Sequence, residues 1–385
     1  MADSIGVAVI GAGMAGRAHA HGYRSAQTVF SAGLPEIRLV SVADLNTELA
    51  ADTARRYGFA RSDSSWQDIV AADDIDAVSV VVANHLHREI VEALAAAGKH
   101  ILCEKPLAPT SDDAEAMAQA VEAAGIVARV GFTFRRTPGI AAVAAEIASG
   151  RLGKPVYISA QYWTDYGTDP SAPITWRYRG GPGSGALADL GSHLTDTAEL
   201  LCGPVTEVTG AQLTTVINER PLPLGHVVGH AQVAVSDTYE PVENDDWASF
   251  SVRFASGATG DLNVSRVATG HPNTLKFEVF CERGALAFDV SRAGEFHLAT
   301  ADAPGYRRVI VGVDHPYLSG GLAMDATGIG TGHNDSFVYQ TRAFLDEIAG
   351  LDEIPRNASF RDGLHALQVQ EQVTAAAVQR VPAAV

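Results

Sequence analysis

The feature that most restricts the fold of this chain is a glycine-rich turn close to its N-terminus. The turn follows the apolar run Ile5–Ile10 and precedes a helical pattern over residues 15–26. Its glycines permit a tight turn and a close approach of the backbone to a pyrophosphate, and the helix that follows presents unpaired N–H groups to that anion. The spacing therefore predicts a dinucleotide site. The motif comprises Gly11, Gly13, Met14, Ala15 and Gly16.

Short apolar runs alternate with helical patterns over the first 135 residues. The runs are continuously apolar, which is typical of strands buried on both faces of a parallel sheet. We therefore predict an α/β fold whose residues 1–135 form a Rossmann domain with a doubly wound parallel sheet. Expected strands are Ile5–Ile10, Ile37–Ala43, Ala77–Val82, His100–Cys103 and Val127–Phe132, and expected helices are 15–26, 47–57, 88–97 and 112–124.

An acidic residue, Asp44, directly follows the second expected strand. A carboxylate at this place accepts hydrogen bonds from the adenosine ribose hydroxyls and repels a 2′-phosphate. No arginine comes after it, because the next residues are Leu45 and Asn46. We therefore expect NAD as the cofactor, with NADP disfavoured. A second interpretation, that Asp44 helps to cap the helix after Asn46, is compatible with this role.

The pattern changes near Pro155, where closely spaced strands joined by short turns begin. Such spacing predicts an antiparallel sheet. We expect residues 136–385 to form a second, α+β domain that contains this sheet. The stretch Arg220–Glu243 is rich in Pro, Gly and polar residues and is predicted to be a long loop. Expected strands are 156–164, 205–217, 248–254, 258–267, 274–280 and 286–290, and expected helices are 335–349 and 361–379.

Polar residues follow two further strands of the first domain. Asn84 and His87 come after the run 77–82, and Glu104-Lys105-Pro106 follows the run ending at Cys103. In open α/β sheets, ligands bind beyond the carboxyl ends of the strands. We therefore expect Asn84, His87, Glu104 and Lys105 near the cofactor, although a lone lysine can equally be a solvated surface residue.

A helix predicted from about residue 188 to Gly203 carries Asp189 and His193 four positions apart. This spacing places both side chains on one helix face, where they can meet. The pair either stabilises the helix or lines a catalytic cleft, and the Gly-rich loop before it favours the cleft.

The segment from Tyr162 to Arg179 contains two of the four tryptophans. Aromatic faces beside a few charged groups suit a ring rich in hydroxyls, whereas the alternative is a packed surface loop. The candidate substrate residues of this segment are Tyr162, Trp163, Asp165 and Arg179.

Together these motifs resemble the Gfo/Idh/MocA oxidoreductase family. The matching pieces are Gly11–Gly16 with His19, Asn84 and His87, Glu104-Lys105-Pro106, and Asp189 to His193 in a D-x-x-x-H pattern. The resemblance implies that the second domain binds substrate, mediates oligomerisation and contains a large, open, mainly antiparallel sheet. It implies a nicotinamide cofactor, a sugar or polyol substrate, and catalytic roles for Lys105, Asp189 and His193. It also implies that Trp176 and Arg177 reach the cofactor and that His333 contacts substrate.

Within the family, the motifs are most similar to those of levoglucosan-type sugar 3-dehydrogenases. This likeness rests on segments such as 134–138, 169–177 and 183–187, and it implies oxidation at C3 of a pyranose, or of inositol, to a ketone. Phe134, a candidate substrate residue, replaces an expected tyrosine, so the pocket lacks one hydroxyl. The alternatives are an NAD-dependent glycoside hydrolase of the same fold, a dinucleotide-sensing regulator without catalysis, and a reductase working in the opposite direction.

The charge composition limits the kinds of partner that this chain can bind. With 28 Lys and Arg against 45 Asp and Glu, the net charge of −17 argues against nucleic acid and anionic membranes as partners. No basic leader precedes residue 5, and no apolar run is long enough for a membrane span, so we expect a cytoplasmic protein.

The pairs His19/His21 and His85/His87 lack partners at ligand spacing, so we expect no metal. Phe277 and Phe280 should lie on opposite faces of the open sheet, which predicts a homodimer or homotetramer.

Overall fold

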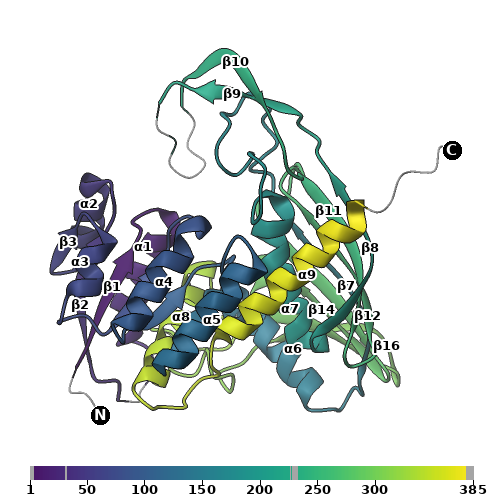
Figure 1. The fold of residues 1–385 in the computed structure, drawn as a ribbon. Helices are drawn as coiled ribbons and strands as arrows, with labels where there is room; N and C mark the ends of the chain where they lie inside the picture. The colour runs from purple at the N-terminus through teal and green to yellow at the C-terminus, as the bar shows by residue number, and fades with distance from the viewer. Residues whose placement is uncertain (1–3, 31–32, 226, 228–232, 379–385) are drawn as a thin grey trace. The chain divides into compact units, whose positions relative to one another are not determined.

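The computed structural model describes residues 4–30, 33–225, 227 and 233–378, which form two compact units (Figure 1). The first unit contains residues up to 138 and 311–364, and the second contains residues 139–310 and those from 365 onward.

The first unit contains a seven-stranded sheet in the order β17-β6-β5-β4-β1-β2-β3. All neighbouring strands are parallel except β17, which is antiparallel to β6. This order confirms the predicted doubly wound sheet and adds β3, whose residues are too polar to resemble a buried strand. The strands are β1 (Ser4–Ile10), β2 (Glu36–Ala43), β3 (Arg61–Asp63), β4 (Ala77–Val80), β5 (His100–Cys103), β6 (Ala128–Val130) and β17 (Ala358–Ser359).

The helices of this unit begin and end at residues suited to those positions. The side chains of Asn46 and Thr110 accept hydrogen bonds from N–H groups of the first turn, and Gly58 and Gly125 end their helices with a positive φ. The helices are α1 (Met14–Ala26), α2 (Thr47–Tyr57), α3 (Trp66–Ala71), α4 (His87–Ala96), α5 (Ser111–Ala124) and α8 (His333–Ile348).

The predicted division at residue 135 differs from the observed units in one respect. Residues 311–364 return to the first unit, where α8 packs on α1 and β17 extends the sheet. A buried guanidinium anchors this return: Arg136 donates from Nε and Nη2 to Asn357 Oδ1, at 2.9 and 2.7 Å, and from Nη1 to Tyr317 OH. These contacts are far apart in the sequence, so local patterns do not reveal them.

The second unit contains an eight-stranded sheet in the order β16-β15-β14-β13-β7-β12-β11-β8. Only β7 and β12 are paired in parallel, so the sheet is mainly antiparallel, as predicted. Strands β15 and β16 were not anticipated. The strands are β7 (Pro155–Trp163), β8 (Val205–Thr214), β11 (Trp247–Phe254), β12 (Thr259–Ser265), β13 (Thr274–Cys281), β14 (Gly284–Asp289), β15 (Glu295–Thr300) and β16 (Ala303–Ile310).

The predicted long loop Arg220–Glu243 is wrong in part. Strands β9 (Glu219–Pro223) and β10 (Val235–Pro241) form a two-stranded sheet here, and residues 226 and 228–232 lie outside the described part. The prolines made this stretch unlike a strand, because proline is unusual in the interior of a sheet. Proline is tolerated in a separate two-stranded hairpin such as this one. The remaining helices are α6 (Pro138–Ala148), α7 (Ser192–Cys202) and α9 (Phe360–Val378), so Gln379, the predicted end of the last helix, lies outside the described residues.

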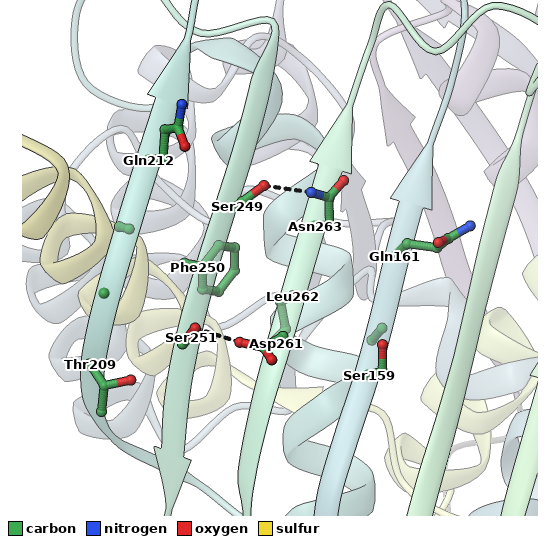
Figure 2. Close-up of a pocket in the computed structure, with 13 residues that line it drawn as sticks. Ser159, Gln161, Thr209, Gln212, Ser249, Phe250, Ser251, Asp261, Leu262 and Asn263 are labelled. Carbon is green, nitrogen blue, oxygen red and sulfur yellow. Dashed lines mark hydrogen bonds between the residues drawn. The ribbon is translucent and has the colours of Figure 1, made fainter. Parts of the chain in front are cut away.

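One face of the eight-stranded sheet is apolar and buried, and the other is polar. Figure 2 shows polar side chains projecting from neighbouring strands, with Asn263 bonded to Ser249 and Ser251 bonded to Asp261. Phe277 is buried whereas Phe280 is exposed, which matches their expected opposite faces. The second face of the sheet therefore presents mostly hydroxyl, amide and carboxylate groups. Among the described residues, no helix is long and apolar enough to cross a membrane.

Removing the anchor of Arg136 should destabilise the first unit. In Asn357→Ala, the buried guanidinium loses both bonds to Oδ1, so we expect a loss of about 3 kcal/mol in the free energy of unfolding. Denaturant unfolding measures it, with the exposed Asn334→Ala as the matched control. Equal stability of the two variants would show that the contact does not hold residues 311–364 in place.

Candidate functional site

The turn between β1 and α1 forms an anion cradle. Gly11 has a φ of 105°, and a Cβ at Gly16 would lie 1.8 Å from the Gly11 oxygen, so both positions require glycine. Gly13 is the N-cap, and within the described structure no side chain caps the helix there. No described atom lies within 4 Å of where a Gly13 Cβ would be, whereas Met14 is exposed. The cradle therefore has unblocked N–H groups and room for a pyrophosphate.

The carboxylate of Asp44 lies beside this cradle. Its Oδ2 accepts a hydrogen bond from the Ala12 N–H and its Oδ1 one from the Asn46 N–H, both at 2.8 Å. The acid is thus fixed to the glycine-rich turn at the end of β2. A negative charge held here suits a ribose diol and opposes a phosphate on the same ribose. These features define the first unit as a dinucleotide-binding Rossmann unit.

Asn84 and His87 follow β4, as expected. Both are buried, and the ring nitrogens of His87 lie 3.1 Å from the Val82 oxygen and 3.0 Å from the Leu107 oxygen. Burial lowers the pKa of His87, although both carbonyls oppose this shift. The imidazole therefore lies between the loops after β4 and β5.

Glu104 and Lys105 lie at the end of β5, where Glu104 is buried and Lys105 half-buried. Burial raises the pKa of Glu104, but the hydrogen bond from His19 and the charge of Lys105 outweigh it, so the pKa falls below its usual value. The structure therefore places an ionised carboxylate beside the predicted catalytic lysine.

His333, the first residue of α8, lies in the same unit as Lys105. Its ring contacts Phe134 and Phe337, with centroid distances of 5.2 and 5.5 Å. His333 as a whole is exposed, yet desolvation of its ring lowers its pKa. The charge of Glu104 opposes this shift, and the charge of Lys105 adds to it. The structure thus brings together Phe134, His333 and Lys105, which lie far apart in the sequence.

In the second unit, Asp189 lies on a π-helical turn, Leu187–Gly191, that leads into α7. The prediction of a regular helix from residue 188 therefore needs correction: the turn is wider, as is frequent at functional sites. Tyr166 donates a hydrogen bond to Asp189 Oδ2 at 2.9 Å. The role of Tyr166 was missed because nothing in the sequence pattern links it to Asp189.

His193 is buried one turn later, in α7. Its ring meets that of Tyr162 edge to face, with centroids 6.1 Å apart, and the Tyr162 hydroxyl bonds to Asn273 Oδ1. Burial and the charge of Asp189 raise the pKa of Tyr162, so this hydroxyl stays protonated. Tyr162, Tyr166, Asp189 and His193 thus form one cluster.

Trp163 is not part of that cluster. Successive strand residues face opposite sides of a sheet, so Trp163 lies on the polar face, where its Nε1 donates to Asn263 at 2.6 Å. This face contains a cavity of about 440 Å³ lined by residues such as Ser159, Gln161 and Asn263 (Figure 2). None of the predicted site residues, all of which are described, lines this cavity.

The segment 164–186 is held by buried arginines. Arg266 pairs with Asp246 at 2.7 Å and donates to the Arg177 oxygen, while the Arg220 and Arg266 guanidiniums lie 4.0 and 4.5 Å from the Tyr178 ring. This clamp fixes the backbone that carries Trp176 and Arg177, whose side chains stack on each other at 4.5 Å.

Two predicted substrate residues of this segment contact other protein groups. Arg179 pairs with Glu240 of β10 at 2.9 Å. The Asp165 backbone oxygen accepts hydrogen bonds from Thr168, which closes a turn after β7.

Comparison with known proteins agrees with these features. Residues 5–132 match a model described as an oxidoreductase family, NAD-binding Rossmann fold, and residues 140–287 match the GFO/IDH/MocA C-terminal domain. The chain is 36% identical to levoglucosan dehydrogenase of Pseudarthrobacter phenanthrenivorans, covering 98% of this chain and 97% of the relative. It is 30% identical to inositol 2-dehydrogenase of Rhizobium meliloti, covering 78% and 79%.

A solved structure of levoglucosan dehydrogenase in complex with NADH and L-sorbose matches with a TM-score of 0.89 and 35% identity, covering 98% of this chain and 97% of that one. This chain therefore belongs to the Gfo/Idh/MocA family of NAD-binding oxidoreductases.

Removing the Asp44 carboxylate should relax cofactor choice. In Asp44→Ala, the repulsion of a 2′-phosphate is lost, so we expect the affinity for NADPH to rise about tenfold or more relative to that for NADH. Quenching of protein fluorescence measures both affinities, and Asp63→Ala is the matched acidic control. An unchanged ratio would mean that Asp44 does not face the ribose.

Proposed function

We propose that this oxidoreductase uses NAD to oxidise a secondary hydroxyl of a sugar or cyclic polyol to a ketone. The observation that carries the proposal is the cluster of Tyr162, Tyr166, Asp189 and His193, in which a fixed carboxylate and a buried imidazole lie beside aromatic rings. The names of the relatives, levoglucosan dehydrogenase and inositol 2-dehydrogenase, support the same substrate class.

The proposal assigns one role to each reacting side chain. His193 accepts the hydroxyl proton as general base, because the usual pKa of imidazole, about 6.5, suits neutral pH. Asp189, itself held by Tyr166, orients this imidazole or a neighbouring hydroxyl. Lys105 stabilises the negative charge that develops on the carbinol oxygen. NAD, when bound, supplies the hydride acceptor that this chain lacks.

We propose that five side chains contact the substrate. They are Phe134, Tyr162, Asp165, Arg179 and His333. Polar groups of this kind favour a ring with many hydroxyls, because an apolar alcohol would leave them unpaired at roughly 1–3 kcal/mol each. We favour oxidation at C3 of a pyranose, with inositol as the second choice.

A substrate panel tests the proposal. The purified chain is mixed with NAD and, separately, with levoglucosan, methyl glucosides, myo-inositol, aliphatic alcohols and amino acids, and NADH is followed by absorbance. We expect NADH with at least one pyranose or inositol and none with the aliphatic alcohols. Activity only on an amino acid or an aldehyde would refute the proposal.

The assignment of His193 makes a second prediction. His193→Ala should lower kcat by about 10²–10⁴, because general-base catalysis typically contributes this factor. The affinity for NADH, measured by fluorescence, should stay within a fewfold of the wild-type value. His271→Ala, which removes a ring from the polar face of the sheet, is the matched control. Wild-type turnover in His193→Ala would exclude the residue as base.

Two further properties stay predictions. We propose a cytoplasmic location, and a homodimer or homotetramer whose interface is the polar face shown in Figure 2. The exposed ring of Phe280, the half-buried ring of Tyr157 6.2 Å from it, and the cavity on this face offer contacts to a second copy. Light scattering of the purified chain reports the mass directly.

A further inference from the structure

The first unit contains a buried chain of hydrogen bonds that ends beside Lys105. Tyr23 OH lies 2.8 Å from Ser79 Oγ, which lies 2.9 Å from His19 Nδ1. His19 Nε2 lies 2.9 Å from Glu104 Oε1, and Glu104 Oε2 accepts the Lys105 backbone N–H at 3.1 Å. Tyr23, Ser79 and His19 are at most 1% exposed. The chain thus links α1 and β4 to the predicted catalytic lysine.

The partners fix the direction of this chain. Glu104 is ionised and can only accept, so the hydrogen on Nε2 of His19 points to Oε1. The other ring nitrogen then faces the Ser79 hydroxyl, which also meets Tyr23. Burial raises the pKa of Tyr23 well above its usual value, so its hydroxyl stays protonated and serves as a donor. Tyr23 can therefore donate to Ser79, Ser79 to His19 Nδ1, and His19 Nε2 to the Glu104 carboxylate.

The surroundings leave the carboxylate little freedom. A Cβ at Gly131, directly after β6, would lie 2.6 Å from Glu104 Oε1, so a side chain there would have to displace this oxygen. The other titratable groups whose charge interacts with Glu104 are Cys103, Lys105, His87 and His333. His19 donates a side-chain hydrogen bond to this carboxylate at 2.9 Å.

We propose that His19 is a positioning residue for Lys105, acting through Glu104. The imidazole holds one carboxylate oxygen, so that the other oxygen fixes the Lys105 backbone and the negative charge faces the lysine side chain. His19 touches neither cofactor nor substrate in this role. The inference rests on the function proposed for Lys105.

A double-mutant cycle tests this. The variants are His19→Leu, Glu104→Gln and the double variant, with kcat measured on NAD and levoglucosan or myo-inositol. We expect His19→Leu to lower kcat by roughly 10- to 100-fold, the range for losing a hydrogen bond to a charged group. In the Glu104→Gln background, the same change should have little further effect, because His19 acts only through Glu104. Additive losses would overturn the proposal.

Conservative variants separate positioning from packing. His19→Gln can still donate to Glu104, so its kcat should stay within about threefold of wild type. The asparagine side chain of His19→Asn is too short to reach Glu104, so its kcat should fall as much as that of His19→Leu. If His19→Leu does not fold, His19→Asn takes its place in the cycle. His100→Leu removes another ring nitrogen, bonded to the Val127 N–H at the far end of β5, and should keep wild-type kcat. Equal losses in His19→Gln and His19→Asn would contradict the proposal.

A spectroscopic measurement is independent of turnover. In ¹⁵N-histidine-labelled protein with NADH bound, the His19 Nε2 proton should resonate far downfield, since it is bonded to a carboxylate. The signal should vanish in His19→Gln and move upfield in Glu104→Gln. The absence of this downfield signal would refute the direction in which His19 Nε2 donates to Glu104. Lys105→Met separates the two claims: wild-type turnover there refutes the role of Lys105, whereas an inactive Lys105→Met with a normal His19→Leu refutes only the positioning role.

Discussion

The close approach of α1 to the parallel sheet is the constraint on which the rest of the first unit depends. A side chain at Gly16 would collide with the Gly11 backbone, and one at Gly22 would lie 2.7 Å from Thr341 Oγ1 of α8. Glycine at both positions lets α1 lie between the sheet and α8. The same packing aims the helix N-terminus at the cradle and buries His19 one turn further on, within reach of Glu104. One helix thus serves both the cofactor and the lysine.

In the second unit, the proposed reacting groups lie on segments that pack against the eight-stranded sheet. Its sheet supplies a rigid surface, and the groups proposed for chemistry stand on the π-helical turn before α7 and on the end of β7. The buried pair Arg266–Asp246 and the Tyr178 ring between two guanidiniums hold the segment that carries Trp176 and Arg177. A charge buried without its partner is costly, so the loss of either member of the pair would destabilise this segment. A firmly held segment suits the proposed orientation of a sugar or polyol.

Sequence patterns predicted the parts whose signals are local. Continuous apolar runs marked the five inner strands of the Rossmann sheet, and glycine spacing marked the cradle. Sequence patterns did not predict β3, which is polar, or β9, which contains prolines. They also did not predict that residues 311–364 return to the first unit, because this return depends on contacts between residues far apart in the sequence. In the site, the partnership of Tyr166 with Asp189 and the opposite orientation of Trp163 depend on a π-turn and on strand register. Spacing in the sequence specifies neither.

The central claim is that the chain oxidises a carbinol and passes its hydride to NAD. The most direct measurement uses a pyranoside deuterated at C3, incubated with NAD, with both products analysed by mass spectrometry and NMR. We expect one deuterium in each NADH formed and one equivalent of 3-keto sugar per NADH. Hydrolysis of the pyranoside without accumulation of NADH, or binding of NAD without any turnover of sugars and inositols, would contradict it.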